Sequence, residues 1–365
     1  MPISELGYRH WEGKRTGLLT RSISIAKSEV SIAYKSSKLL RRFLVFAWMP
    51  ILYFCPFFLA IGYVADPKNA LDEGTILTQI ALNFLPPEAL SQLREHPEIS
   101  LPGIWSIAFY FFFAYTGSVL SMIVVAIVGP PLIAKDVRSK AFLVYFSKPI
   151  QPWQYLLGKL GTVIFFVFSM TLFPALLLYA IGIGLSPNGS TVVATLPILL
   201  KVVASSLLTA VPIAMVVLLI SSFTKDRKIA TFLWVAVWIF GEIAFRTLTL
   251  GSRFSDDVEP PLWASLLSIR ELTTRATSGV FNVRQNIEIL LEQFKDSSGD
   301  LRETLIDLAR DMGEVSLSGA DPRSSEILEI AGSGYPPIVS ILCLIGLSVG
   351  CGLVILKRAK SQVNI

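Results

Sequence analysis

Three ionisable side chains lie within or beside long apolar runs of this sequence, namely Lys201, Glu242 and Arg246. A charged group inside a membrane is costly and is usually kept for a partner or a function. Glu242 and Arg246 are four residues apart, so a helix would bring them to one face, where they can form an ion pair. Two interpretations follow. Either the pair is neutralised near the lipid headgroups while Lys201 reaches towards them, or the three groups line the outer gate of a substrate pathway.

The remaining residues do not support catalytic chemistry of other kinds. Gly158 and Lys159 lack the rest of the Gly-x-x-x-x-Gly-Lys-Ser/Thr loop that binds nucleotide phosphates. The two histidines, His10 and His96, are expected on opposite sides of a membrane, which argues against a metal centre and against a histidine-activated hydrolase. We therefore expect no catalytic residue, no bound metal and no cofactor held by this chain, and hence no enzyme activity of its own.

A basic segment with several aromatic residues, residues 135–159, lies between two of the apolar runs. Its aromatic side chains can form a ridge on a short helix, with positive charge around it that would orient a docking partner. Pro149 and Pro152 would end this helix. A second interpretation is that the aromatic residues lie in the inner leaflet while the lysines meet anionic lipid. The ridge and its rim consist of Phe142, Tyr145, Phe146, Arg138, Lys140 and Lys148.

These residues require membrane-spanning helices to position them. The chain has 365 residues, of which 53% are apolar and 16% charged, and its mean hydropathy is +0.61. A helix needs about 20 apolar residues to cross a bilayer. Six runs are long enough, and the second exceeds what one span requires, so it would tilt or project beyond the bilayer. The six runs are Phe43–Val64, Ile104–Ala134, Leu160–Leu185, Val202–Phe223, Ile229–Leu250 and Pro337–Leu356.

The charges between these runs alternate in sign, which predicts the orientation of the chain. Residues 1–42 carry nine Lys/Arg and three acidic residues, and residues 135–159 carry five and one. Residues 65–103 instead carry two basic and six acidic residues. The positive-inside rule therefore places both termini in the cytoplasm. The net charge of +5 is the sum of basic inner rims and acidic outer loops, so we expect no nucleic-acid partner.

The cytoplasmic segment 1–42 is predicted to contain a helix that lies on the inner leaflet and leads into the first span. This helix is indicated by apolar or small residues that fall on one helical face. They are Val30, Ala33, Tyr34, Ser37 and Leu40. Residues 43–250 then hold spans 1 to 5, and residues 337–365 hold span 6 and a basic cytoplasmic tail.

Two outer segments complete the predicted architecture, an all-α polytopic membrane protein. Residues 65–103 form a small cap, and residues 251–336 form an extracytoplasmic helical insertion. Within the insertion, helical spacing and the pairing of Asp300 with Glu303 predict a hairpin over 284–313. Residues 262–269 are apolar enough for a short re-entrant or interfacial helix.

The segment from Asp136 to Lys159 resembles the first cytoplasmic loop of the ABC-2 type permease family. The resemblance rests on an acidic residue, a Ser-x-Pro element and a Tyr-Leu-Leu-Gly-Lys end. These are Asp136, the stretch 147–149, and the stretch 155–159, which includes Gly158 and Lys159. A weaker likeness covers Leu218–Lys225. Lys140 and Ala141 occupy the usual Gly-Thr, so the local turn is expected to differ.

The resemblance implies the membrane subunit of an ATP-driven exporter, in a bacterial inner membrane. In that family the loop forms a coupling helix on a separate ABC ATPase subunit, which binds ATP and Mg. Two permease subunits, identical or paralogous, complete the transporter in the lipid bilayer. The aromatic run at 109–113 suits an amphiphilic or carbohydrate substrate, or ordinary lipid-facing packing. Two other classes stay open: a non-transporting scaffold that docks a partner through the outer hairpin, and an ion-coupled carrier.

Overall fold

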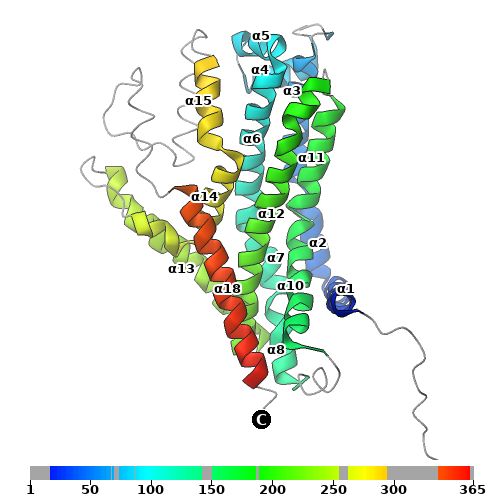
Figure 1. The fold of residues 1–365 in the computed structure, drawn as a ribbon, viewed down its shortest axis with the longest axis vertical. Helices are drawn as coiled ribbons and strands as arrows, with labels where there is room; N and C mark the ends of the chain where they lie inside the picture. Colours follow the sequence, from blue (N-terminus) through cyan, green and yellow to red (C-terminus); the bar gives the residue numbers. More distant parts are fainter. Residues whose placement is uncertain are drawn as a thin grey trace, which may run out of the picture.

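The computed structural model is an elongated bundle of helices (Figure 1). It describes residues 17–66, 68–69, 74–85, 87–141, 150–185, 189–254, 262–293 and 336–361, and these contain helices and turns but no strand. The predicted all-α class is therefore confirmed. The α-helices are α1 (Leu18–Ser36), α2 (Lys38–Phe46), α3 (Pro50–Ala65), α4 (Ile76–Leu82), α5 (Pro87–Glu95), α6 (Pro97–Tyr115), α7 (Ser121–Val128), α8 (Pro130–Arg138), α10 (Pro152–Phe168), α11 (Leu172–Gly184), α12 (Gly189–Phe223), α13 (Arg227–Phe254), α14 (Ile269–Phe281), α15 (Val283–Gln293) and α18 (Pro337–Ser361). A π-helix, η1 (Thr116–Leu120), and a 3₁₀ helix, η2 (Leu262–Leu267), complete the set.

Proline marks the start of many of these helices. Its fixed φ suits the first helical turn, and its missing N–H has no intrahelical partner there in any case. In the described chain, the helices that begin with proline are α3, α5, α6, α8, α10 and α18. Pro152, which the sequence predicted to end a helix, accordingly begins α10.

Five helical stretches among the described residues are long and apolar enough to cross a membrane. A sixth candidate is the pair α10 and α11, which is bent by 42° at a short break and counts if it forms one span. The structure thus has five or six candidate spans, and the count of six stays a prediction. The five stretches are Lys38–Ala65, Pro97–Arg138, Gly189–Phe223, Arg227–Thr249 and Pro337–Ala359.

The break within the first span lies beside the break between α10 and α11. The chain turns at residues 47–49, and the indole Nε1 of Trp48 donates a hydrogen bond to the backbone oxygen of Ser169 at 2.9 Å. This bond satisfies a carbonyl at the end of α10, which matters because a bare backbone group is costly in lipid. This hydrogen bond therefore links the break in the first span to the break between α10 and α11.

A helix is present where the interfacial helix was predicted, with different limits, and its place on the inner leaflet stays a prediction. α1 runs from Leu18 to Ser36, and the chain breaks at Ser37, whose side chain accepts a hydrogen bond from the backbone N–H of Leu40 and caps α2. Leu40 thus belongs to the next helix, so the predicted stripe crosses a helix boundary. A serine that caps a following helix marks a boundary between two helices. The periodic spacing of apolar residues contains no information about such a boundary.

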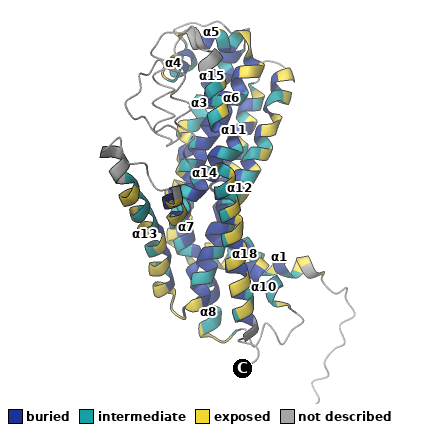
Figure 2. Ribbon diagram, turned by 60° about the vertical axis from the view of Figure 1, so that its left-hand side comes forward, coloured by how far each residue is buried: buried dark blue, intermediate teal, exposed yellow. Residues whose placement is uncertain are grey.

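α12 is the central helix of the bundle and packs against α6, α8, α10, α14 and α18 (Figure 1). α13 instead diverges from the bundle and is mostly exposed (Figure 2). In the most apolar 18 residues of α13, 17% of the residues are buried, whereas 56% are buried in the corresponding part of α12. α13 therefore offers an apolar surface to lipid or to another membrane chain.

The aromatic run at 109–113 is part of the protein core. Phe109, Tyr110, Phe112 and Phe113 are all buried, and the ring of Phe109 stacks on Phe281 of α14. Lipid-facing packing is therefore wrong for these four residues, and a contact with substrate stays a prediction. The reason is that α14, which the sequence did not predict, packs Phe281 on Phe109 and Phe113, while Phe112 packs on Phe54 of α3.

The segment after α13 returns towards the bundle. η2 packs against the middle of α13, where a β-carbon on Gly241 would lie 2.5 Å from the carbonyl oxygen of Leu267. α14 then passes between α6, α12 and α18 before α15 rises beside α6. The short helix predicted for 262–269 corresponds to η2, and its re-entrant or interfacial position stays a prediction. The first helix of the predicted hairpin corresponds to α15, while its second helix, with Asp300 and Glu303, lies outside the described residues.

Candidate functional site

The loop that follows α8 is shorter than the predicted segment 135–159. α8 continues to Arg138 and α10 begins at Pro152, because both ends of the segment are drawn into helices. Gly158 and Lys159 consequently lie in the second turn of α10. The predicted ridge and part of its rim, Phe142, Tyr145, Phe146, Lys148 and Pro149, lie outside the described residues.

The two helices that flank this loop are joined by a buried ion cluster. Nζ of Lys159 in α10 lies 2.8 Å from Oδ2 of Asp136 in α8 and 2.5 Å from Oε1 of Glu29 in α1. The Lys159 side chain is 1% exposed, that of Asp136 13% and that of Glu29 19%. One lysine therefore connects three helices. We call these three residues, together with Tyr155, the clamp.

Tyr155 extends the clamp on α10. Its hydroxyl donates a hydrogen bond to Oδ2 of Asp136 at 2.6 Å, and Nζ of Lys159 lies 5.3 Å from the centre of its ring. Asp136 thus accepts from both a cation and a hydroxyl, the arrangement that a buried carboxylate requires. The side chain of Asp136 is committed to the interior and does not face a docking partner.

Gly158 explains how α1 comes close enough to reach Lys159. A β-carbon at this position would lie 2.7 Å from the Ile25 side chain and 3.1 Å from the backbone oxygen of Ser22. Contacts this short do not occur between real atoms, so only glycine permits this crossing of α1 over α10. Gly158 and Lys159 therefore act together, one by allowing close approach and the other by providing the charge.

α8 is fixed at its other end by α12. The hydroxyl of Ser221 donates to the backbone oxygen of Pro130 at 2.7 Å and accepts from the backbone N–H groups of Ile133 at 3.2 Å and Ala134 at 3.0 Å. The first N–H groups of a helix have no intrahelical partner, so this serine caps α8 from a neighbouring helix. The weaker sequence likeness at 218–225 includes this residue.

A tight turn follows α8, at the position where Lys140 replaces the usual glycine and where a different turn was expected. Lys140 has φ 52°, the left-handed conformation that favours glycine, and the backbone N–H of Ala141 donates to the carbonyl of Asp136 at 3.0 Å. This is the hydrogen bond of a Schellman motif. The turn is therefore made with lysine where the family usually has glycine, at a conformational cost.

The three outer candidates form two separate sites. Glu242 and Arg246 make the predicted ion pair at 2.7 Å, but Arg246 is 65% exposed. Glu242 also binds Arg270 at 2.8 Å and accepts a hydrogen bond from the Ser268 hydroxyl at 3.0 Å. The carboxylate thus ties the N-terminal end of α14 to α13, a role that sequence spacing did not suggest.

Lys201 makes a different contact, at the other end of α14. Its Nζ donates a hydrogen bond to the backbone oxygen of Phe281 at 3.3 Å, and the amide of Asn286 donates to the same oxygen at 2.8 Å. Phe281 is the last residue of α14, and a cation at a helix C-terminus is favourable. The observed contacts explain Lys201 as a cap, and its role in an outer gate stays a prediction.

A comparison with protein families identifies the chain. The family model described as ABC-2 family transporter protein matches residues 23–360. The chain belongs to this family. Comparisons with curated proteins and with solved structures gave no match. As an ABC-2 family member with several apolar helices, the chain is an integral membrane protein and a permease subunit of an ABC transporter.

The family resemblance stated from residues 136–159 is therefore confirmed, but the clamp was not predicted. Asp136 and Lys159 were predicted as parts of the coupling loop and not as an ion pair. Tyr155 and Ser221 were noted only within the two stretches that resemble the family, and Glu29 was missed. The sequence did carry a signal for the two acidic residues of the clamp. Glu29 is the one acidic residue in α1, and Asp136 is the one acidic residue in 135–159. A lone acid in a basic segment indicates an internal ion pair.

Proposed function

We propose that this permease subunit belongs to an ABC exporter in which separate ATPase subunits move the loop between α8 and α10. The movement reaches the bundle through the clamp, because the loop is attached to the helices that the clamp joins. The substrate is driven outwards by the resulting rearrangement of the spans. ATP and Mg act on the ATPase subunits, and a second permease subunit completes the membrane part.

The clamp supports this proposal because it restricts how the loop can move. Asp136 lies two residues before the end of α8, and Tyr155 and Lys159 lie in the first two turns of α10. The ion pair between Asp136 and Lys159, with Oδ2 and Nζ 2.8 Å apart, links α8 to α10. A force on the loop therefore moves the two helices together. Glu29 adds α1 to the same unit, and Ser221 attaches the unit to α12.

The distribution of charge supports a cytoplasmic position for this loop. The ends of α8, α12, α13 and α18 near the loop carry exposed basic side chains, and we call this region the basic end. By the positive-inside rule, the basic end faces the cytoplasm, where soluble ATPase subunits are found. Its exposed basic residues are Lys135, Arg138, Lys140, Lys225, Arg227, Lys228 and Lys357.

The test is whether an ATPase is retained through the loop. The tagged chain is purified from its native membrane in mild detergent, and co-purifying proteins with nucleotide-binding motifs are quantified. Replacing Phe142→Asp and Tyr145→Asp together should abolish their retention, because the substitutions put charge on the apolar docking ridge that the sequence predicts. Lys225→Asp is the matched control. It changes the charge by the same amount at the same end of the bundle, but in the turn after α12.

The outcomes separate the proposal from its rivals. Retention by the wild type and the control but not by the double variant supports coupling through the loop. Retention by all three removes the loop from the mechanism, and no ATPase with any variant favours a membrane scaffold. Transport in ATP-free vesicles that follows an imposed ion gradient would instead identify an ion-coupled carrier.

A further inference from the structure

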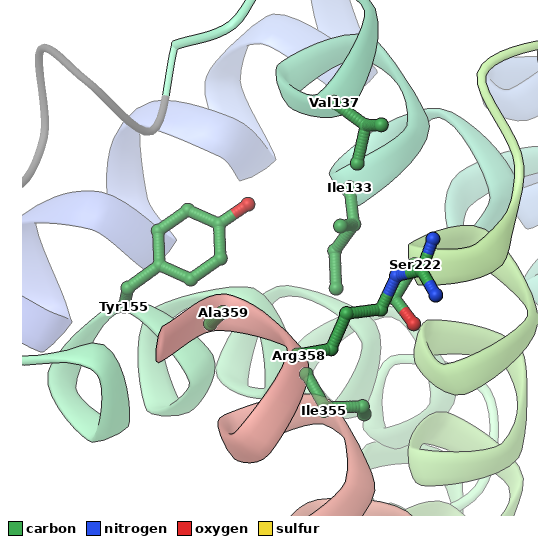
Figure 3. A pocket seen from close by; sticks show the side chains of 7 residues that line it. All are labelled: Ile133, Val137, Tyr155, Ser222, Ile355, Arg358 and Ala359. Atoms are coloured by element: carbon green, nitrogen blue, oxygen red, sulfur yellow. The ribbon is translucent and has the colours of Figure 1, made fainter. Parts of the chain in front are cut away.

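A pocket at the basic end is not used by the proposed coupling mechanism. It lies between the ends of α8, α10, α12 and α18, with Tyr155 on one side and Ser222 and Arg358 on the other (Figure 3). The rest of its wall is aliphatic. The lining residues are Ile133, Val137, Tyr155, Ser222, Ile355, Arg358 and Ala359. An apolar wall beside a guanidinium suits a ligand with a hydrocarbon part and an anionic group.

The charge around the pocket favours an anion. The described acidic residues at this end are Glu29, Asp136 and Asp226, and the first two are paired with Lys159. The exposed basic residues of the basic end outnumber them. A group with negative charge is therefore attracted to this end of the bundle.

The surface that leads to the pocket favours a lipid over a protein. α18 exposes an apolar face that includes Val349, Leu353 and Val354, and Lys357 follows one turn after Leu353. Arg358 lies at the edge of this face, with its guanidinium 4.3 Å from the centre of the Phe223 ring, which is itself 55% exposed. The apolar face of α18 thus ends at two cationic side chains, Lys357 and Arg358. A phospholipid has the matching arrangement, since its acyl chains are followed by its phosphate.

We propose that this site binds one anionic phospholipid of the cytoplasmic leaflet. Its acyl chains cover the exposed face of α18, and its phosphate contacts Arg358 and Lys357. The glycerol region lies over the mouth of the pocket, beside Ile355 and Ala359. Tyr155 belongs both to the pocket wall and to the clamp, so the lipid contacts the unit that joins α8, α10 and α1. The proposal uses the cytoplasmic position of the basic end but does not require an ATPase.

The experiment measures lipid retained by the full chain. The protein is reconstituted in nanodiscs with equal amounts of phosphatidylglycerol and phosphatidylcholine, released, and examined by native mass spectrometry. Arg358→Gln should reduce bound phosphatidylglycerol about fivefold, since one basic group near an anionic surface is worth about 1 kcal/mol. Ala359→Phe should reduce it as well, because the larger side chain fills the pocket without any change in charge.

Lys228→Gln provides the control, because it removes one exposed charge from the same end of the bundle, on α13. Unchanged retention in this variant, with loss in the other two, supports a defined site. Equal loss in Lys228→Gln, or no loss in Arg358→Gln, would overturn it. If Arg358→Gln keeps its lipid but loses the co-purifying ATPase, the pocket binds protein and the lipid proposal is wrong. Loss of lipid with the ATPase still bound leaves the proposed function intact.

Discussion

Nζ of Lys159 lies 2.8 Å from Oδ2 of Asp136, and this ion pair joins the two helices on either side of the loop. The two residues are separated by a loop of basic and aromatic residues, yet both side chains point into the bundle. A buried ion pair is only modest evidence for stability, since desolvation offsets much of the attraction. Its value here is geometric, because it fixes the distance between α8 and α10.

Removing the lysine should be strongly destabilising. Lys159→Met keeps the length of the side chain but leaves Asp136 and Glu29 as unpaired, largely buried carboxylates. Breaking a buried pair in this way costs about 3–5 kcal/mol. The free energy of unfolding, measured in detergent by denaturant titration, should fall accordingly, whereas the exposed Lys135→Met should change it by less than about 0.5 kcal/mol.

A compensated variant makes the same prediction sharper. If charge imbalance is the cause, adding Glu29→Gln and Asp136→Asn to Lys159→Met should restore most of the lost stability. A triple variant as unstable as the single one would show that Lys159 acts through packing and not through its charge.

Gly158 should not tolerate a methyl group. Gly158→Ala places a β-carbon 2.7 Å from Ile25, so α1 must move away from α10. Gly161→Ala is the control on the same helix, because its β-carbon would lie 3.4 Å from Ala26, an ordinary contact. Limited trypsin digestion should cut at Arg21 and Lys27 of α1 faster in Gly158→Ala alone. Equal digestion of both variants would argue against a close crossing of the helices.

The cap that α12 provides for α8 should be measurable. Ser221→Ala leaves the backbone N–H groups of Ile133 and Ala134 without this acceptor, at a cost of about 1–2 kcal/mol. Ser222→Ala removes a hydroxyl that bonds within its own helix, to Leu219. Hydrogen exchange at the start of α8 should accelerate for Ser221→Ala and stay unchanged for Ser222→Ala. Unaltered exchange in the first variant would mean that α8 does not depend on this serine.

The left-handed residue after α8 gives a prediction in the stabilising direction. Lys140→Gly and Lys140→Ala both remove the charged side chain, and only glycine relieves the backbone at φ 52°. The glycine variant should therefore exceed the alanine variant in free energy of unfolding by about 1–2 kcal/mol. Equal stabilities would place Lys140 outside the left-handed region in solution.

Much of the fold could be predicted from the sequence because its strongest signal is the hydropathy of long segments. Apolar runs of about 20 residues are specified locally, and five of the six predicted runs fall within a helical stretch of the structure, while Leu160–Leu185 spans the break between α10 and α11. The all-α class and the helix at 283–293 follow from the same periodicity. The boundary at Ser37 was missed because a single capping residue outweighs an apolar stripe.

α14 shows what periodicity could not supply. Its segment is rich in Thr, Ser and Arg, so it does not look like a helix of a membrane core, yet Thr273 and Thr277 are buried there. Their hydroxyls donate to backbone oxygens of the same helix, which removes the cost of burying them. Arg270 is likewise neutralised by Glu242, a partner 28 residues away in sequence that only the folded chain brings close.

The most direct test of the account is the side of the membrane on which the loop lies. In a variant lacking Cys55, Cys343 and Cys351, a single Lys148→Cys substitution provides a thiol in the loop. A membrane-impermeant maleimide should label it in inside-out vesicles and not in intact cells, because a soluble ATPase must reach the same residue. Labelling of intact cells would place the loop outside and contradict coupling through the clamp.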